Sequence, residues 1–165
     1  FRRRQADRVF RTLSSDGGLS WSVPEPTDLP NNNSSVQARE LADGRIALIF
    51  NDRAASVAPG ERPVPPWIKD AAAFITQCGI TDPAAAAVWG VPRNPLVLAS
   101  SRDLGVTWER ELVLEADADL RSAHDETGAF TGDYSYPSII QTADGLVQVC
   151  YSYLRDHIKH VTLAP

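Results

Sequence analysis

The sequence lacks the signatures of several common functional classes. Its 165 residues hold no Gly-rich phosphate-binding loop, no paired cysteines at zinc-ligand spacing and no Gly-x-Ser-x-Gly nucleophile elbow. No apolar run approaches the roughly 20 residues of a membrane-spanning helix, so we predict no membrane span. We also predict no cofactor and no bound metal. No secretory signal is visible, but the chain begins with Phe1, so its start does not indicate a compartment.

Positive charge and cysteine are also scarce. The 16 Lys and Arg against 21 Asp and Glu give a net charge of −5, which argues against a nucleic-acid partner despite the basic run at 2–4. The two cysteines, Cys78 and Cys150, do not define a disulfide by their spacing, and a buried free thiol fits the strand-like run around Cys150. Overlapping sequons at Asn32 and Asn33 would accept a glycan only in a secreted protein.

One eight-residue pattern, Ser-x-Asp-x-Gly-x-Ser/Thr-Trp, occurs twice, at 14–21 and at 101–108. Its residue types suit a tight turn between two strands. The Asp carboxylate accepts hydrogen bonds from N–H groups of the turn, the Gly adopts positive φ, and the Trp packs back beneath the turn. Two copies with the same fixed positions indicate a repeated structural unit.

A second repeat alternates with the first. The tripeptide Ala-Asp-Gly stands at 42–44 and again at 143–145, each time between two apolar-rich segments. Asp-Gly between such segments predicts a β-hairpin, because the turn needs positive φ. The chain therefore runs in the order eight-residue pattern, hairpin, eight-residue pattern, hairpin.

The eight-residue pattern resembles the Asp-box of the sialidase-like β-propellers, and the chain is similar to the broad BNR-repeat family. In a four-stranded blade of such a propeller, the Asp-Gly turn joins strands one and two and the Asp-box joins strands three and four. The resemblance implies an all-β fold, a partial six-bladed β-propeller with about two blades of four-stranded antiparallel sheets. Residues 1–165 would be part of one domain, with the box itself on a rim away from the active site.

This assignment divides the chain into blades. Strand three of the first blade is expected at 8–13 and strand four after Trp21, one complete blade at about 35–114, and a third blade from Tyr136 to a strand at 157–163. A ring needs four to eight blades, so we expect either a longer protein or other chains that complete the sheets.

Two long connections interrupt the blades. Residues 54–92 form an insertion that is proline-rich at first and then has helical apolar spacing from Ile68 to Cys78, ended by Gly79. Residues 115–133 read as a long loop. Loops of this length are uncommon unless functional, so both connections are candidates for a substrate rim or a partner surface.

The resemblance also implies site residues. Arg93 precedes a strand that leads into an Asp-box, and Tyr136 stands eight residues before Asp144, the positions of a triad arginine and the nucleophilic tyrosine. Tyr134 is the alternative if the register slips by two, and Arg53 resembles another triad arginine. Arginine binds a sialic acid carboxylate bidentately, and a neutral tyrosine attacks the anomeric carbon without charge repulsion.

Other readings of these residues remain open. The tyrosines also fit the role of aromatic residues that pack within strands, and Arg93 and Arg53 also fit the role of surface residues at strand ends. His124 with Asp125 and Glu126 would bind a cation or form a solvated loop.

The chain also departs from the family pattern. An early Arg-Ile-Pro-like motif and the acid/base aspartate near it are absent, and no acid stands at 34–37, where the resemblance places the glutamate that activates the tyrosine. Glu40 is the nearest acid in sequence. We therefore expect at most half of a catalytic site, without activity in this chain alone.

Two functional hypotheses follow. In the first, the chain is a portion of a sialidase-like exo-glycoside hydrolase that acts on a sialoside or another terminal acidic glycan. In the second, it is a non-catalytic propeller, a binding module or a structural subunit whose open sheet edges pair with other protein chains.

Overall fold

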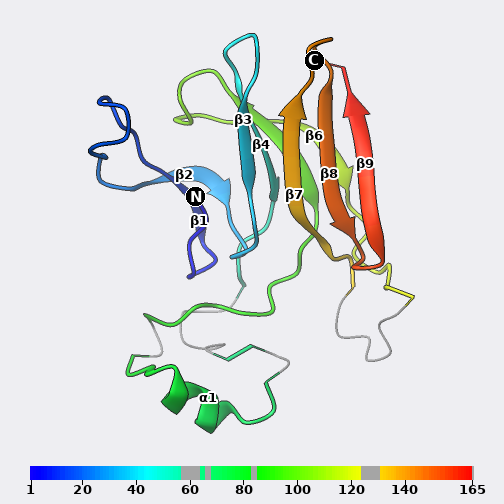
Figure 1. The fold of residues 1–165 in the computed structure, drawn as a ribbon. Coiled ribbons are helices and arrows are strands. Elements are labelled where there is room, and N and C mark those ends of the chain that lie inside the picture. The colour runs from blue at the N-terminus through cyan, green and yellow to red at the C-terminus, as the bar shows by residue number, and fades with distance from the viewer. Residues whose placement is uncertain (57–63, 66–67, 83–84, 124–130, 165) are drawn as a thin grey trace.

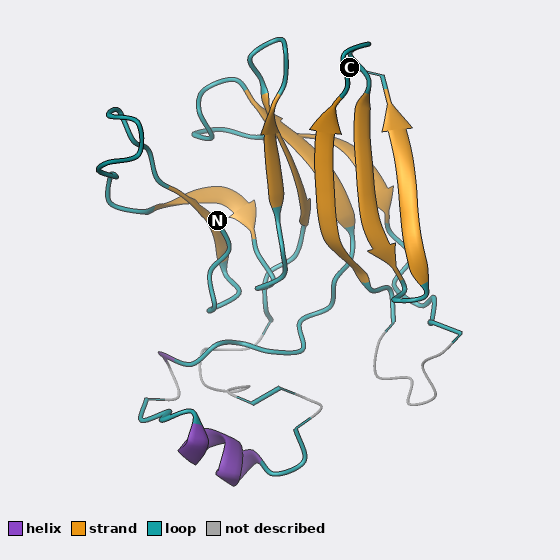
Figure 2. Cartoon of the chain, in the orientation of Figure 1, coloured by secondary structure: helices purple, strands orange, loops and turns teal. Residues whose placement is uncertain are grey.

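The chain folds into three antiparallel sheets (Figure 1). The computed structural model describes residues 1–56, 64–65, 68–82, 85–123 and 131–164. Within these ranges strands dominate, and the only α-helix is α1 (Ala71–Gln77) (Figure 2). The first sheet holds β1 (Arg8–Arg11) and β2 (Glu25–Pro30). The second holds β3 (Gln37–Glu40), β4 (Ile46–Asn51), β5 (Leu96–Ser101) and β6 (Glu109–Glu115), and the third holds β7 (Tyr134–Gln141), β8 (Val147–Tyr153) and β9 (His157–Leu163).

The strand order confirms the predicted all-β fold of a partial propeller. The middle sheet runs β3-β4-β5-β6, so each strand pairs with its neighbours in sequence as in one complete blade. One Asp-Gly turn joins β3 to β4 and the other joins β7 to β8, while the Asp-boxes join β1 to β2 and β5 to β6. Two predicted boundaries differ, because β1 ends at Arg11 and β7 begins at Tyr134.

The core lies between the sheets, and the two central strands of the middle sheet, β4 and β5, are buried on both faces. Every residue of β5 is buried, and the side chains alternate between the two sides. Leu96 and Leu98 pack with Tyr134 and Tyr151 of the third sheet, whereas Val97 and Ala99 pack toward the first sheet. A strand buried on both faces is mostly apolar, which explains the Leu-Val-Leu-Ala run of β5. Its two buried serines, Ser100 and Ser101, donate hydrogen bonds to the carboxylates of Glu111 and Asp103.

The two ends of the sheets differ in character (Figure 1). The Asp-Gly turns and the Asp-boxes lie at one end, which we call the turn end. The described parts of the connections 52–95 and 116–133 lie at the opposite end, which we call the site end. The Asp-boxes therefore lie at the opposite end of the sheets from Arg53 and Arg93, the candidate arginines.

Each Asp-box is a self-contained hydrogen-bonded turn. In the second box, the Asp103 carboxylate accepts hydrogen bonds from the backbone N–H of Thr107 at 2.9 Å, from its hydroxyl at 2.6 Å and from the Ser101 hydroxyl at 2.8 Å. The Trp108 indole N–H donates to the Gly105 carbonyl at 3.2 Å. Gly105 has a φ of 81°, and a Cβ there would lie 3.3 Å from the Trp108 ring, so a side chain at this position would be strained and glycine is favoured. These contacts confirm the turn predicted from the pattern.

The insertion contains the expected short helix. The Asp70 side chain caps it by accepting a hydrogen bond from the backbone N–H of Ala73 at 2.9 Å, but no residue of α1 is buried. Val88 is buried and donates its backbone N–H to the Arg4 carbonyl at 2.7 Å, which ties this segment to the start of the chain. No helix in the described parts of the chain is long and apolar enough to span a membrane.

The hydrogen bonds to Asp103 hold the pKa of its carboxyl at about 2, below the ordinary 3.8. Because the folded pKa is depressed, the carboxylate contributes stability fully above 3.8, and that contribution is lost as the pH falls toward about 2. We predict that Asp103→Asn lowers the unfolding temperature at neutral pH. In this variant the unfolding temperature should also fall less steeply as the pH is lowered. Thermal unfolding from neutral pH to about 2 measures both, with the exposed Asp119→Asn as control. A neutral-pH stability equal to that of the wild type would contradict the prediction.

Candidate functional site

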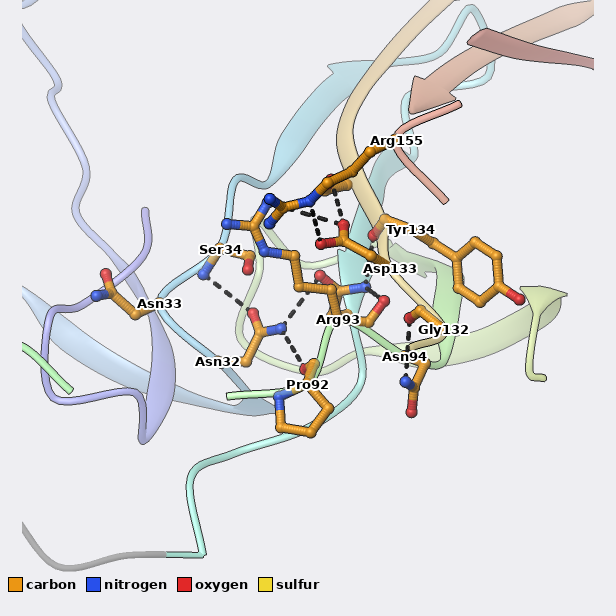
Figure 3. Close-up of polar contacts among 12 residues, drawn as sticks. Asn32, Asn33, Ser34, Pro92, Arg93, Asn94, Gly132, Asp133, Tyr134 and Arg155 are labelled. Carbon is orange, nitrogen blue, oxygen red and sulfur yellow. Dashed lines mark hydrogen bonds and ion pairs between the residues drawn. The ribbon is translucent and has the colours of Figure 1, made fainter. Parts of the chain in front are cut away.

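Buried asparagine side chains connect the three sheets at the site end. The Asn51 amide, at the end of β4, donates to the Arg93 carbonyl at 2.7 Å and to the Tyr134 carbonyl at 3.0 Å. The Asn32 amide, just after β2, donates to the Asn51 side-chain oxygen at 3.2 Å and to the Pro92 carbonyl at 2.9 Å (Figure 3). The backbone that carries Arg93 is therefore fixed relative to the beginning of β7.

Tyr136 stands out from β7 in a strained conformation. Its φ is 53°, in the left-handed region that a bulky side chain rarely adopts, and the β7–β8 register shifts between Ser135 and Ser138. The side chain is 62% exposed, whereas Ser135 and Pro137 on either side are buried. Such strained positions cluster at functional sites, so the backbone singles out this tyrosine.

Arg93 lies over the exposed tyrosine. Its guanidinium carbon is 5.1 Å from the centre of the Tyr136 ring, within the range of a cation–π interaction. Hydrogen bonding to Arg93 and the positive charge of its guanidinium lower the pKa of the Tyr136 phenol below its ordinary value. The structure thus brings together the two residues that the sequence singled out from distant segments. The same arrangement favours the phenolate, the more nucleophilic form.

Tyr134 occupies a different environment. It is fully buried, its ring is directed away from Asp133 and Arg93 in Figure 3, and its hydroxyl donates to the Asp117 carbonyl at 2.9 Å. Burial raises the pKa of its phenol to about 12. These features are those of an aromatic residue in the core of the fold. Of the two candidate tyrosines, Tyr136 therefore has the geometry of a nucleophile.

Arg53 lies near the same end of the sheet. It follows β4, is half-buried, and its Nε donates to the Asn94 carbonyl at 2.7 Å. This bond ties Arg53 to the segment that carries Arg93. Its assignment as a second carboxylate-binding arginine stays a prediction.

The acid expected to activate the tyrosine is not at the predicted place. Residues 34–37 carry no carboxyl group, and Glu40 pairs with Ile46 beside the turn of Asp43 and Gly44. It lies at the turn end, where it lines an open hollow together with residues of the other Asp-Gly turn. Glu40 is therefore on the wrong end of the sheet to reach Tyr136.

Sequence reasoning missed two charged residues of the site. Asp133 is buried between two arginines: the Arg155 Nε lies 2.8 Å from its Oδ2, and an Arg93 terminal nitrogen lies 4.0 Å from its Oδ1 (Figure 3). No motif marked either residue. The one available signal for Asp133 was its place directly before the strand of the candidate tyrosine. A carboxylate that is buried at such a place needs a charged or hydrogen-bonding partner.

Several other predicted features have plain structural outcomes. Both cysteines are free; Cys78 is exposed and Cys150 is half-buried rather than buried. The Asn32 sequon is unsuitable for a glycan in the folded chain, because its amide is buried and hydrogen-bonded. Among the described residues no group of three His, Cys, Asp or Glu side chains could hold a metal ion. The loop of His124, Asp125 and Glu126 lies outside those residues.

Comparison with known proteins agrees with this architecture. A family model described as a BNR repeat-like domain matches residues 1–149, which is most of the chain. No curated protein matches. The chain belongs to the BNR repeat-like family, which confirms the resemblance drawn from the two Asp-boxes.

The asparagine connection predicts a large loss of stability when Asn51 is truncated. Asn51→Ala removes a hydrogen bond from each of two buried carbonyls and from the Asn32 amide, and an unsatisfied buried polar group costs roughly 1–3 kcal/mol. We expect the unfolding free energy to fall by about 2–4 kcal/mol in urea denaturation. Gln37→Ala, which truncates an exposed amide on β3, is the control and should change it by less than about 0.5 kcal/mol. Equal losses in both variants would rule out the connecting role.

The Arg93–Tyr136 contact predicts separate titrations for the tyrosines. In an alkaline titration followed by phenolate absorbance, one component should titrate below the ordinary tyrosine value of 10.0 and disappear in Tyr136→Phe. Arg93→Gln should move it upward, because the cation that favours the phenolate is gone. The Tyr134 component should stay near 12. Arg45→Gln at the turn end is the control, and a shift as large as that of Arg93→Gln would contradict the assignment.

Proposed function

We propose that this BNR repeat-like chain supplies the tyrosine and arginine part of the active site of a sialidase-like exo-glycoside hydrolase. Its substrates are sialosides or other glycans that end in an acidic sugar. Tyr136 is the nucleophile, Arg93 binds the sugar carboxylate, and Arg53 is a second arginine for the same group. The observation that carries the proposal is the exposed, strained Tyr136 beneath the Arg93 guanidinium.

The chemistry of such a substrate fits these two side chains. A carboxylate next to the anomeric carbon is bound by a guanidinium through two parallel hydrogen bonds. The Tyr136 oxygen forms a bond to the anomeric carbon as the glycosidic bond breaks, and the phenol proton passes to a base that would come from outside the residues assigned in this chain. A lowered phenol pKa makes that proton easier to remove. The acid that protonates the departing oxygen would come from outside the residues assigned in this chain.

A second candidate function is a propeller that binds acidic glycans without cleaving them. The position of Glu40 at the turn end favours it, because residues 34–37 carry no acid to take the tyrosine proton. In this case Arg93 and Tyr136 form a recognition surface, and the open sheet edges accept other protein chains. Hydrolysis separates the two candidates.

We predict that the full protein carrying this chain hydrolyses a fluorogenic sialoside and that Tyr136→Phe lowers kcat at least about 10³-fold, as expected for loss of a nucleophile. Tyr153→Phe is the matched control, because its ring packs against Tyr134 and His157. Circular dichroism verifies that both variants fold. Equal turnover by Tyr136→Phe and wild type would disprove the nucleophile assignment.

A glycan-binding assay tests the second candidate function, a propeller that binds acidic glycans without cleaving them. Arg93→Gln removes charge-assisted hydrogen bonds of about 1.5–3 kcal/mol, so N-acetylneuraminic acid should bind roughly 10–100-fold more weakly. Binding that depends on Arg93 in a protein without turnover would support the non-catalytic module. The absence of both binding and turnover would exclude both functions.

A further inference from the structure

The third sheet ends in an open strand edge. Its strand order is β7-β8-β9, so β9 lies at the outer side of the sheet and, among the described strands, pairs on one side only (Figure 1). We propose that this edge joins two copies of the chain, with β9 of one copy adding antiparallel to β9 of the other. The inference goes beyond the proposed function, because β8 separates this edge from β7, the strand of Tyr136.

The other outer strands carry features that block such pairing. β2 contains Pro26 and Pro30, and β7 contains Pro137, and a proline has no N–H to donate to a neighbouring strand. β1 and β3 have only four residues each. β6 begins with the charged run 109–111, and its pairing with β5 shifts register twice. Short strands, prolines, register shifts and charges are the usual means by which proteins protect a sheet edge.

The edge formed by β9 is long and regular. Its seven residues pair with the seven residues of β8 in unbroken register, from Val147 opposite Leu163 to Tyr153 opposite His157. The strand contains no proline and is rich in residue types with β propensity. By these criteria β9 is the outer strand best able to accept another strand through main-chain hydrogen bonds.

The one lysine of β9 does not protect this edge. The Lys159 Nζ forms an ion pair with Glu115 of β6 and lies 4.9 Å from the centre of the Tyr153 ring. Both contacts draw its charge onto the face of the sheet that packs against the middle sheet, where Val161 of the same strand also lies. The ammonium group is therefore directed at its own chain and not at an approaching strand.

The polar side chains on the opposite face of β9 are also directed back toward the sheet. The His160 Nε2 lies 2.8 Å from the Gln148 Oε1, and the Thr162 hydroxyl donates to the same oxygen at 2.7 Å. Gln148 belongs to β8, so these side chains lean inward over the sheet. The outer backbone of β9 is thereby left accessible.

A second copy of β9 fits this edge, because the other outer strands of a second copy are protected. Antiparallel pairing of all seven residues puts His160 at the centre, opposite His160 of the second copy. Ile158 then faces Thr162, and Lys159 faces Val161, so no two lysines stand opposite each other. Ile158, which is 69% exposed, gains a neighbour across the contact. Such a contact uses the same surface on both copies, so it closes at two.

The first test measures the mass of the full chain, 18.0 kDa for one copy, by sedimentation equilibrium. The mass should rise toward that of two copies as the concentration is raised from about 1 µM to about 1 mM, as expected for a small interface. Hydrogen exchange measured at both concentrations should show slower exchange of N–H groups in β9 and no change in β6. A one-copy mass throughout, or assembly beyond two copies, would overturn the proposal.

The second test changes the charge at the centre of the pair. His160→Lys puts two lysines opposite each other and His160→Glu puts two glutamates there, so each variant should associate at least about fivefold more weakly than the wild type. An equal mixture of the two variants should associate about 10-fold more tightly than either alone, because opposite charges then face each other. Circular dichroism verifies that both variants of this exposed side chain fold.

Ser138→Lys is the matched control. Ser138 is exposed and lies in the same row of the sheet as Cys150 and His160, but on β7. It should change the dissociation constant less than about twofold. A loss as large as that of His160→Lys would mean that the faces of the sheets meet and would overturn the pairing of edges. A mixture that associates no more tightly than its components would overturn the antiparallel pairing centred on His160.

Discussion

The geometry of the candidate site depends on one buried side chain, the amide of Asn51. Ladder hydrogen bonds hold each sheet together but cannot join one sheet to the next, because neighbouring sheets meet through side chains. At the site end, the carbonyls of Arg93 and Tyr134 are turned toward the interior and need donors. A primary amide offers two donors and an acceptor in one group, and Asn51 uses all of these to join Arg93, Tyr134 and Asn32. The candidate arginine and the candidate tyrosine strand are thereby held in one fixed relation.

The two ends of the sheets are stabilised over very different distances along the chain. In the second Asp-box, the bonds to Asp103 join residues no more than four positions apart. At the site end, the bonds of Asn51 join residues 42 and 83 positions apart. A local turn forms from its own sequence, whereas the site end is complete only when all three sheets have packed together. Truncation of Asn51 should therefore disturb the site end and leave the box turns intact.

This difference explains what the sequence could predict. The boxes, the two hairpins and the blade order follow from short patterns whose hydrogen bonds are local, and the structure confirms them. The meeting of Arg93 and Tyr136 was predicted only through a family resemblance, since no spacing rule joins residues so far apart. Asp133 had one signal in the sequence, its place directly before the strand of the candidate tyrosine, and Arg155 had none. Their contact requires positive φ at Leu154 and Arg155, which the preferences of these residue types disfavour.

The backbone around Tyr136 favours a functional reading over that of a strand aromatic. From Ser135 to Ile139 the side chains alternate, with 135, 137 and 139 buried and 136 and 138 exposed, whereas Tyr134 breaks the alternation by packing inward. A tyrosine that served only the core would be extended and buried, as Tyr134 is. Positive φ costs on the order of 1–3 kcal/mol and persists only where the surroundings enforce it. Buried neighbours on both sides and Arg93 above impose it here, and their combined effect is to keep a phenol at the surface beside two guanidinium groups.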